Sequence, residues 1–116
     1  MVAGSEGPDL LETFHDYQGR AIRLTRRQWE HIQDHHDYMA GLRGTIQETL
    51  ADPEEVCNSR EDPETVRLYY WRYTIPGERD KWMCVVVKLL ADDAFVLTAY
   101  ETRRIKQGWL ICRKEF

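Results

Sequence analysis

The first clear pattern of hydrophobic and polar positions is helical and starts at Thr25. Thr25 and Gln28 have the T-x-x-Q spacing of a capping box, in which the threonine side chain accepts from a backbone N–H at the start of a helix. Leu24 and Trp29 flank this cap at the spacing of a hydrophobic staple. Trp29 and Ile32 share one helix face. The pattern predicts a helix that begins at this cap and buries Trp29 and Ile32.

A second helical pattern spans about residues 41–51. Leu42, Ile46 and Leu50 recur every four residues, so they form one apolar stripe along a helix. Pro53 follows shortly afterwards, and proline cannot continue the helical hydrogen-bond ladder. We therefore expect this helix to end before the proline.

Beyond this proline the hydrophobic pattern changes from a helical to an alternating period. Val56 opens a short strand, and the segments "TVRLYYWRYTI", "KWMCVVVKLL" and "AFVLTAY" predict three longer ones. The segments "IPGERD" and "ADD" predict the turns between them. Ahead of both helices, "FHDYQGRAIRL" indicates a short hairpin or extended pair that turns at Gln18 and Gly19.

These elements predict an α+β fold, in which two N-terminal helices pack on a four-stranded, largely antiparallel sheet. We expect residues 1–12 to form a flexible N-terminal tail and residues 13–116 to form a single domain. No apolar run approaches the roughly 20 residues that a membrane helix needs. The first residues lack the basic and apolar regions of a signal peptide, so we expect a cytoplasmic protein without a membrane partner.

Charge is unevenly distributed along this acidic chain. The net charge of −4 argues against tight indiscriminate binding to nucleic acid. Residues 20–27 and 101–116 are nevertheless basic, and they would form a local phosphate-attracting face if they meet in space. The alternative is that these are scattered, solvated cations. The substrate-binding residues predicted from the two stretches are Arg26, Arg27, Arg103, Arg104 and Lys106.

Three of the four histidines lie in the stretch "EHIQDHHDYM". His31 and His35 have the i, i+4 spacing of two zinc ligands on a helix, but the H-E-x-x-H motif is absent and no obvious third ligand follows. Cys57, Cys84 and Cys112 are widely spaced and include no C-x-x-C pair. We therefore predict no metal site and no cofactor.

Several segments together resemble a known family. They are "IRLTRRQWEHI", His36, "IQETLADPEEV", "YYWRY", "VVVK" and "FVLTAYET", in this order. The set is similar to the phage-associated members of the Barnase–EndoU–colicin–RelE nuclease superfamily, from about Gly19 to about Gly108. Where that family's pattern has a proline after the second histidine, this chain has Asp37. The resemblance implies an α+β fold and metal-independent cleavage of RNA.

The resemblance also implies a set of catalytic residues, namely His31, His36, Lys88, Thr98 and Tyr100. A metal-free ribonuclease uses the 2′-hydroxyl of its substrate as nucleophile, so it needs a base, an acid and groups that hold the phosphate. The expected division has His31 as base and His36 as acid, or the reverse. Lys88 would stabilise the transition state, Thr98 would bind phosphate, and Tyr100 would bind phosphate or share the acid role. A neutralising antitoxin or immunity protein is a further expected partner.

Each of these residues also has a purely structural interpretation. By the helical period His36 lies about 140° from His31, so a straight helix would not aim both at one point. Lys88 is equally typical of an exposed strand end, and Thr98 and Tyr100 are common strand formers. The alternative function is a catalytically inactive binding module of the same fold that engages a protein or RNA. The enzyme requires the five side chains to converge around one cleft.

Overall fold

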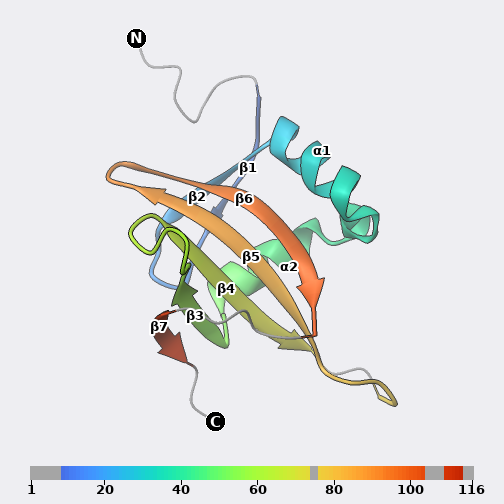
Figure 1. Ribbon diagram of the computed structural model, residues 1–116. Helices are drawn as coiled ribbons and strands as arrows, with labels where there is room; N and C mark the ends of the chain where they lie inside the picture. The colour runs from blue at the N-terminus through green and yellow to red at the C-terminus, as the bar shows by residue number, and fades with distance from the viewer. Residues whose placement is uncertain (1–8, 74–75, 104–108, 114–116) are drawn as a thin grey trace.

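The computed structural model describes residues 9–73, 76–103 and 109–113, the last segment as backbone only. In chain order the elements are β1 (Leu10–His15), β2 (Ala21–Thr25), α1 (Arg26–His35), the 3-10 helix η2 (Asp37–Gly41), α2 (Arg43–Ala51), β3 (Glu55–Asn58), β4 (Val66–Tyr73), β5 (Lys81–Leu90), β6 (Asp93–Thr102) and β7 (Trp109–Arg113). Figure 1 shows the strands as one curved sheet, with α2 behind it and α1 beside β6. The turn positions and the two helices expected from the sequence are present.

The expected four-stranded sheet with two N-terminal helices is wrong. The described strands form a seven-stranded sheet in the order β1-β2-β6-β5-β4-β3-β7, and the β1–β2 hairpin precedes the helices. The sheet is mixed, because β2 joins β6 in parallel through the pair Arg23 and Phe95. This junction and the pairing of β7 with β3 connect segments far apart in the sequence, so local periodicity contains no signal for either.

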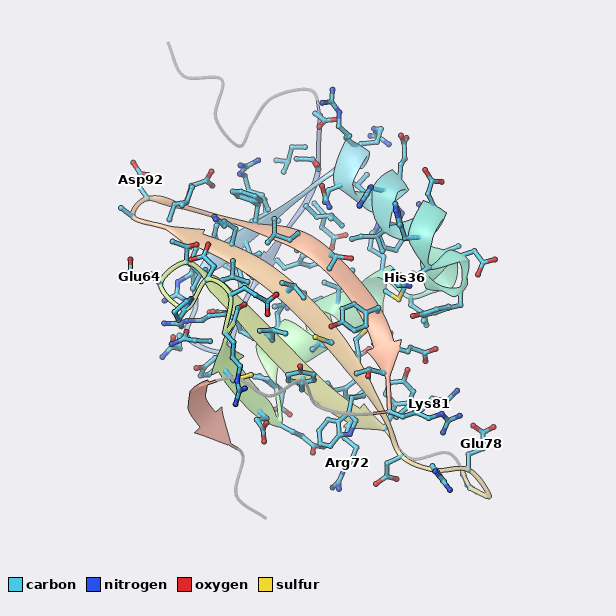
Figure 2. All side chains as sticks on the ribbon, viewed as in Figure 1. His36, Glu64, Arg72, Glu78, Lys81 and Asp92 are labelled. Atoms are coloured by element: carbon cyan, nitrogen blue, oxygen red, sulfur yellow. The ribbon has the colours of Figure 1, made fainter. Side chains whose placement is uncertain are left out.

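The two ends of the sheet carry different turns. The β3–β4 loop with Glu64 and the β5–β6 turn with Asp92 lie at one end (Figure 2). The β4–β5 turn with Glu78 lies at the other end, which is also where β6 finishes (Figure 2). We call this second end the β4–β5 end. The candidate site lies beside it.

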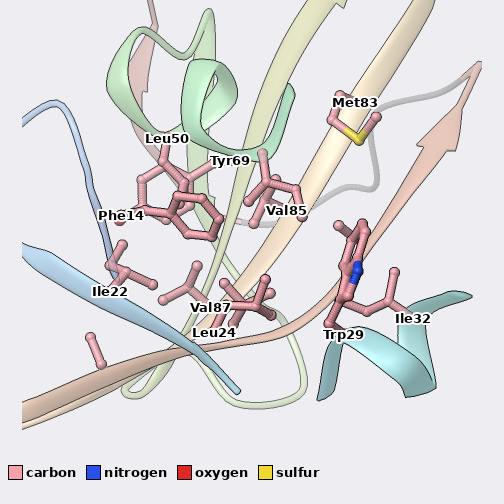
Figure 3. Packing of buried hydrophobic residues seen from close by; sticks show 14 of the residues in the cluster. Phe14, Ile22, Leu24, Trp29, Ile32, Leu50, Tyr69, Met83, Val85 and Val87 are labelled. Atoms are coloured by element: carbon pink, nitrogen blue, oxygen red, sulfur yellow. The ribbon is translucent and has the colours of Figure 1, made fainter. Parts of the chain in front are cut away.

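Alternation along the strands gives the sheet two different faces. On the helix face, Tyr69, Met83, Val85, Val87 and Ala99 are buried together with apolar residues of α1, η2 and α2 (Figure 3). The opposite face, which we call the open face because the described helices pack on the other one, also has buried residues, namely Leu68, Tyr70 and Cys84, with Cys57 of β3. Side chains at alternate positions of β5 and β6 therefore reach opposite faces.

The β1–β2 turn is fixed by a buried carboxylate. Gly19 has a φ of 83°, which suits glycine because it has no Cβ to clash. The Asp16 carboxylate accepts the backbone N–H groups of Gln18 at 3.0 Å and Arg20 at 2.9 Å. It also accepts the hydroxyl of Tyr69 on β4 at 2.8 Å, so the turn is joined to the core.

Helix α1 runs beside the exposed edge of β6. Thr25 caps the helix by accepting from the backbone N–H of Gln28 at 3.1 Å, which confirms the predicted cap. The Gln28 side chain does not complete the capping box. It donates instead to the carbonyl oxygen of Leu97 on β6. This contact fixes α1 to the strand that carries Thr98 and Tyr100.

Helix α2 covers the helix face and also closes the outer edge of β1. Ile46 and Leu50 are fully buried, as their spacing predicted. The Gln47 side chain accepts from the backbone N–H of His15 at 3.2 Å and donates to its carbonyl oxygen at 3.0 Å. A side-chain amide thus takes the place of a neighbouring strand at this end of β1.

Of the tail expected at residues 1–12, residues 1–8 lie outside the described part, and residues from Leu10 onward belong to β1. The expected division into a tail and one domain stays a prediction. None of the helices in the described segments is long and apolar enough to cross a membrane.

Candidate active site

His36 and Tyr100 are in contact where α1 ends beside β6. Their ring centroids are 5.6 Å apart with an interplanar angle of 31°. His36 is half-buried and serves as the C-cap of α1, with its backbone N–H donating to the Ile32 carbonyl oxygen at 2.8 Å. Figure 2 places His36 next to the last part of β6. The helix end therefore brings an imidazole to a phenol from a strand about 60 residues later in the chain.

Thr98, Tyr100 and Lys88 all lie on the open face. Thr98 is paired with Val86 and Tyr100 with Cys84, so their side chains share the face that Cys84 occupies. Lys88 follows Val86 by two residues on β5 and has the same orientation. The shared face of Thr98 and Tyr100 agrees with the two-residue period used to predict it.

Lys88 does not reach the contact between His36 and Tyr100. It lies four residues along β5 from Cys84, the partner of Tyr100, which corresponds to about 13 Å. Its ammonium group is 3.1 Å from Asp62 in the β3–β4 loop. Asp62 also accepts the Thr65 hydroxyl, and these two interactions hold the pKa of its carboxyl below the usual value. The structure thus separates Lys88 from the helix end.

His31 is one and a half turns before His36 and is exposed. Its ring centroid is 4.2 Å from that of His35, whose Nδ1 is 3.0 Å from the His31 carbonyl oxygen. His36 thus makes a ring contact with β6, whereas the ring contact of His31 is with its helix neighbour His35.

The two basic stretches do not meet in the described part of the chain. Arg26 and Arg27 are exposed at the first turn of α1, whereas Arg103 is exposed just beyond β6 at the β4–β5 end. The helix between them is ten residues, or about 15 Å, long and runs parallel to β6. Arg104 and Lys106, the other predicted substrate-binding residues, lie outside the described residues.

Tyr100 is half-buried, and this makes it a phenol that keeps its proton. Removal from water raises the pKa of Tyr100, and its hydrogen bond and proximity to Cys84 raise it further. A phenol with a raised pKa stays protonated at neutral pH and can donate a hydrogen bond, although it gives up its proton less readily than a free tyrosine. Cys84 is itself buried and in the described region carries no disulfide.

A small cavity lies where β6 ends, at the β4–β5 end of the sheet. Its volume is about 240 Å³, and it is lined by Tyr38, Lys81, Glu101, Thr102 and Arg103. Tyr38 connects it to the helix end, because its ring centroid is 5.9 Å from that of His36. Sequence analysis did not single out Tyr38, Lys81, Glu101 or Thr102. Tyr38 could have been noticed because it lies only two residues after His36. The other three are distant from His36 in the sequence and come close to Tyr38 only in the folded chain.

The comparison with known proteins gives the family of the chain. Residues 3–111 match the family described as phage-Barnase-EndoU-ColicinE5/D-RelE like nuclease2. The chain belongs to this nuclease family. No curated protein and no solved structure matches the chain. The nuclease family makes nucleic acid the expected class of substrate.

For this nuclease, the structure brings together part of the set that the sequence predicted. His36 and Tyr100 are in contact, and Thr98 is on the same face as Tyr100. Lys88 stands apart with Asp62, so the structure does not bring all five side chains to one cleft as the enzyme was expected to require. In the described segments, no group of three or more His, Cys, Asp or Glu side chains could hold a metal ion. The catalytic roles of the five residues stay predictions.

Proposed function

We propose that this nuclease is a metal-independent endoribonuclease that cleaves RNA by attack of the 2′-hydroxyl on the neighbouring phosphate. The contact between His36 and Tyr100 supports this proposal most directly. An imidazole can take or give a proton, while a protonated phenol can donate a hydrogen bond or, as a weak acid, a proton. These are the two proton-transfer functions that such a reaction needs.

In the proposed reaction the scissile phosphate lies along the β6 edge. One histidine takes the proton of the 2′-hydroxyl as its oxygen bonds to phosphorus. As the bond from phosphorus to the 5′-oxygen breaks, the other histidine or Tyr100 gives that oxygen a proton. The products are a 2′,3′-cyclic phosphate and a 5′-hydroxyl. The position of His36 beside Tyr100 favours these two as the acid pair and leaves His31 as base, with Thr98 donating to a phosphate oxygen.

Lys88 needs a change of partner for the role that the family resemblance implies. In the structure its ammonium is paired with Asp62 about 13 Å along the strand from the level of Tyr100. A bound RNA strand that follows the open face would compete with Asp62 for this cation. The proposed role of Lys88 is therefore to stabilise phosphate charge after it has left Asp62.

The Lys88–Asp62 ion pair also favours the second candidate function, a catalytically inactive binding module of the same fold. In such a module the lysine would simply tie the β3–β4 loop to the sheet. A neutralising antitoxin or immunity protein as partner, and a cytoplasmic location, stay predictions for either function.

The test is cleavage of a mixed RNA pool in the presence of EDTA. The proteins compared are the wild type and the variants His36→Ala, His31→Ala, Tyr100→Phe and Lys88→Ala, with Glu30→Gln on the exposed part of α1 as control. We expect the wild type and the control to produce 2′,3′-cyclic phosphate ends. Loss of one proton-transfer group should lower the rate by roughly 10²–10⁴-fold, so His36→Ala and His31→Ala should be almost inactive.

The possible outcomes separate the two functions. Cleavage that is abolished by EDTA, or that leaves 3′-hydroxyl ends, contradicts the metal-free mechanism. Equal cleavage by His36→Ala and the wild type contradicts the site. No cleavage by the wild type, combined with RNA binding that Lys88→Ala leaves unchanged, supports the binding module.

A further inference from the structure

We propose that the cavity at the β4–β5 end binds the nucleobase next to the scissile phosphate, and that it selects a base carrying an amino group. This proposal rests on the proposed function, since cleavage beside His36 is what makes the neighbouring nucleotide the occupant. The cavity of about 240 Å³ is smaller than the roughly 300–1,000 Å³ of pockets for drug-sized ligands. Its size suits a single planar base.

The first argument is an exposed aromatic ring that is held in place. Tyr38 is 42% exposed and, with Leu90, is one of two large apolar side chains so exposed in the described part of the chain. Its hydroxyl accepts the backbone N–H of Glu101 at 2.8 Å, which fixes the ring against the edge of β6. A fixed, exposed ring is a suitable platform for a base, because every base has a π-face that can stack on it.

The second argument is a carboxylate in the same cavity that can only accept hydrogen bonds. The Tyr73 hydroxyl donates to Oε2 of Glu101, and Oε1 has no hydrogen-bond partner within the described segments. A carboxylate accepts well from an amino group, as in pairs between acidic side chains and cytosine N4. Adenine, cytosine and guanine each present an amino group. Uracil has no amino group, and its N3–H donor lies between two carbonyl oxygens that repel a carboxylate.

The third argument is the pair of cations at the rim. Lys81 lies at the β4–β5 end of the sheet (Figure 2), where its ammonium is 3.7 Å from Glu78, and Arg103 is exposed. Both line the same cavity as Glu101. A base alone would not need cations beside the Glu101 carboxylate. A nucleotide would, because it carries a phosphate close to its base. The mixture of acceptor, ring and cations therefore fits a nucleotide.

The experiment measures binding and cleavage separately. Binding is followed by fluorescence anisotropy with four 2′-fluoro-RNA hexamers, one of each base, because these probes lack the attacking hydroxyl. Cleavage preference is read by sequencing the ends released from a random RNA pool. The variants are Tyr38→Ala, Tyr38→Phe and Glu101→Gln. The controls are Leu90→Ala, the other exposed apolar residue, and Glu30→Gln, an exposed glutamate on α1.

We expect Tyr38→Ala to weaken binding of the adenine, cytosine and guanine hexamers about tenfold, as loss of one stacked base does, while Tyr38→Phe retains binding. Glu101→Gln should lose the preference over the uracil hexamer, and uridine should no longer be depleted beside the cut. Thermal unfolding of each variant checks that it is folded.

Two results would overturn the subsite without affecting the nuclease. One is wild-type binding and end preference in folded Tyr38→Ala and Glu101→Gln, while His36→Ala abolishes cleavage. The other is a wild type that binds the uracil hexamer as well as the other three. If the wild type fails to cleave but the hexamer preferences follow the variants as expected, the base subsite stands and the proposed ribonuclease activity fails.

Discussion

The contribution of a single polar side chain to stability depends on whether water can replace its hydrogen-bond partner when that partner is removed. Tyr69 and Tyr73 both donate a hydroxyl hydrogen bond to a carboxylate, Tyr69 to Asp16 and Tyr73 to Glu101. Tyr69 and Asp16 are buried, whereas Tyr73 is partly exposed. Burial also raises the pKa of both phenols, so each stays a donor across the ordinary pH range. Water can reach only the second pair.

We therefore expect Tyr69→Phe to lower the free energy of unfolding by about 1.5–3 kcal/mol, the range for hydrogen bonds to charged groups. Tyr73→Phe should cost less than about 1 kcal/mol, because water can replace the lost donor. Urea unfolding of both variants and the wild type measures the difference. Equal losses of unfolding free energy in the two variants would show that burial of the Asp16 carboxylate does not determine how much its hydrogen bond with Tyr69 contributes to stability.

At the scale of elements, the position of α1 is what creates the candidate site. Thr25 caps the helix, the Gln28 side chain holds it to Leu97 on β6, and His36 at its last turn meets Tyr100. The helix thus takes the place of a neighbouring strand along the second half of β6. A small shift of α1 along β6 would move His36 away from Tyr100 without unfolding either element.

Gln28→Ala should therefore reduce RNA cleavage more than it reduces stability. Misplacement of a catalytic group by about 1 Å can cost up to about 10²-fold in rate, whereas one hydrogen bond contributes about 0.5–1.5 kcal/mol to stability. The matched control is Gln33→Ala, because the Gln33 amide donates within α1, to the Trp29 carbonyl oxygen at 3.3 Å. Initial rates with EDTA and urea unfolding are compared. Equal rates in the two variants would exclude Gln28 as a positioning residue.

The same elements show what local pattern can and cannot predict. The cap at Thr25 and the shared face of Thr98 and Tyr100 follow from sequence periods, and the structure contains both. The place of the N-terminal hairpin in the sheet does not, because β2 joins β6 through a single residue pair across about 70 positions. For the same reason the contact of His36 with Tyr100 could not be predicted from the sequence. The helical period gave the angle between His31 and His36 but not the strand that α1 lies against.

For the whole molecule, the question is how an acidic chain binds a polyanion. The net charge is −4, so attraction must come from a few local cations. The structure offers two arrangements. In one, Lys81 and Arg103 at the β4–β5 end contact phosphates. In the other, Arg26 and Arg27 at the far end of α1 also contact phosphates. Because α1 is about 15 Å long, this requires an RNA strand that follows the whole length of the helix.

The salt dependence of binding separates these arrangements. For single strands the slope of log K against log salt concentration is about −0.7 per phosphate neutralised. With a 2′-fluoro-RNA dodecamer and the Lys88→Ala variant, in which the cation proposed to leave Asp62 is removed, contacts by Lys81 and Arg103 alone predict a slope of about −1.4, and participation of Arg26 and Arg27 predicts about −2.8. We expect the smaller slope, and Lys81→Gln should reduce it to about −0.7, while Arg26→Gln leaves it unchanged. A slope near −2.8 that Arg26→Gln reduces would instead place the RNA along α1, past His31 and His36, with both ends of the helix in contact with phosphate.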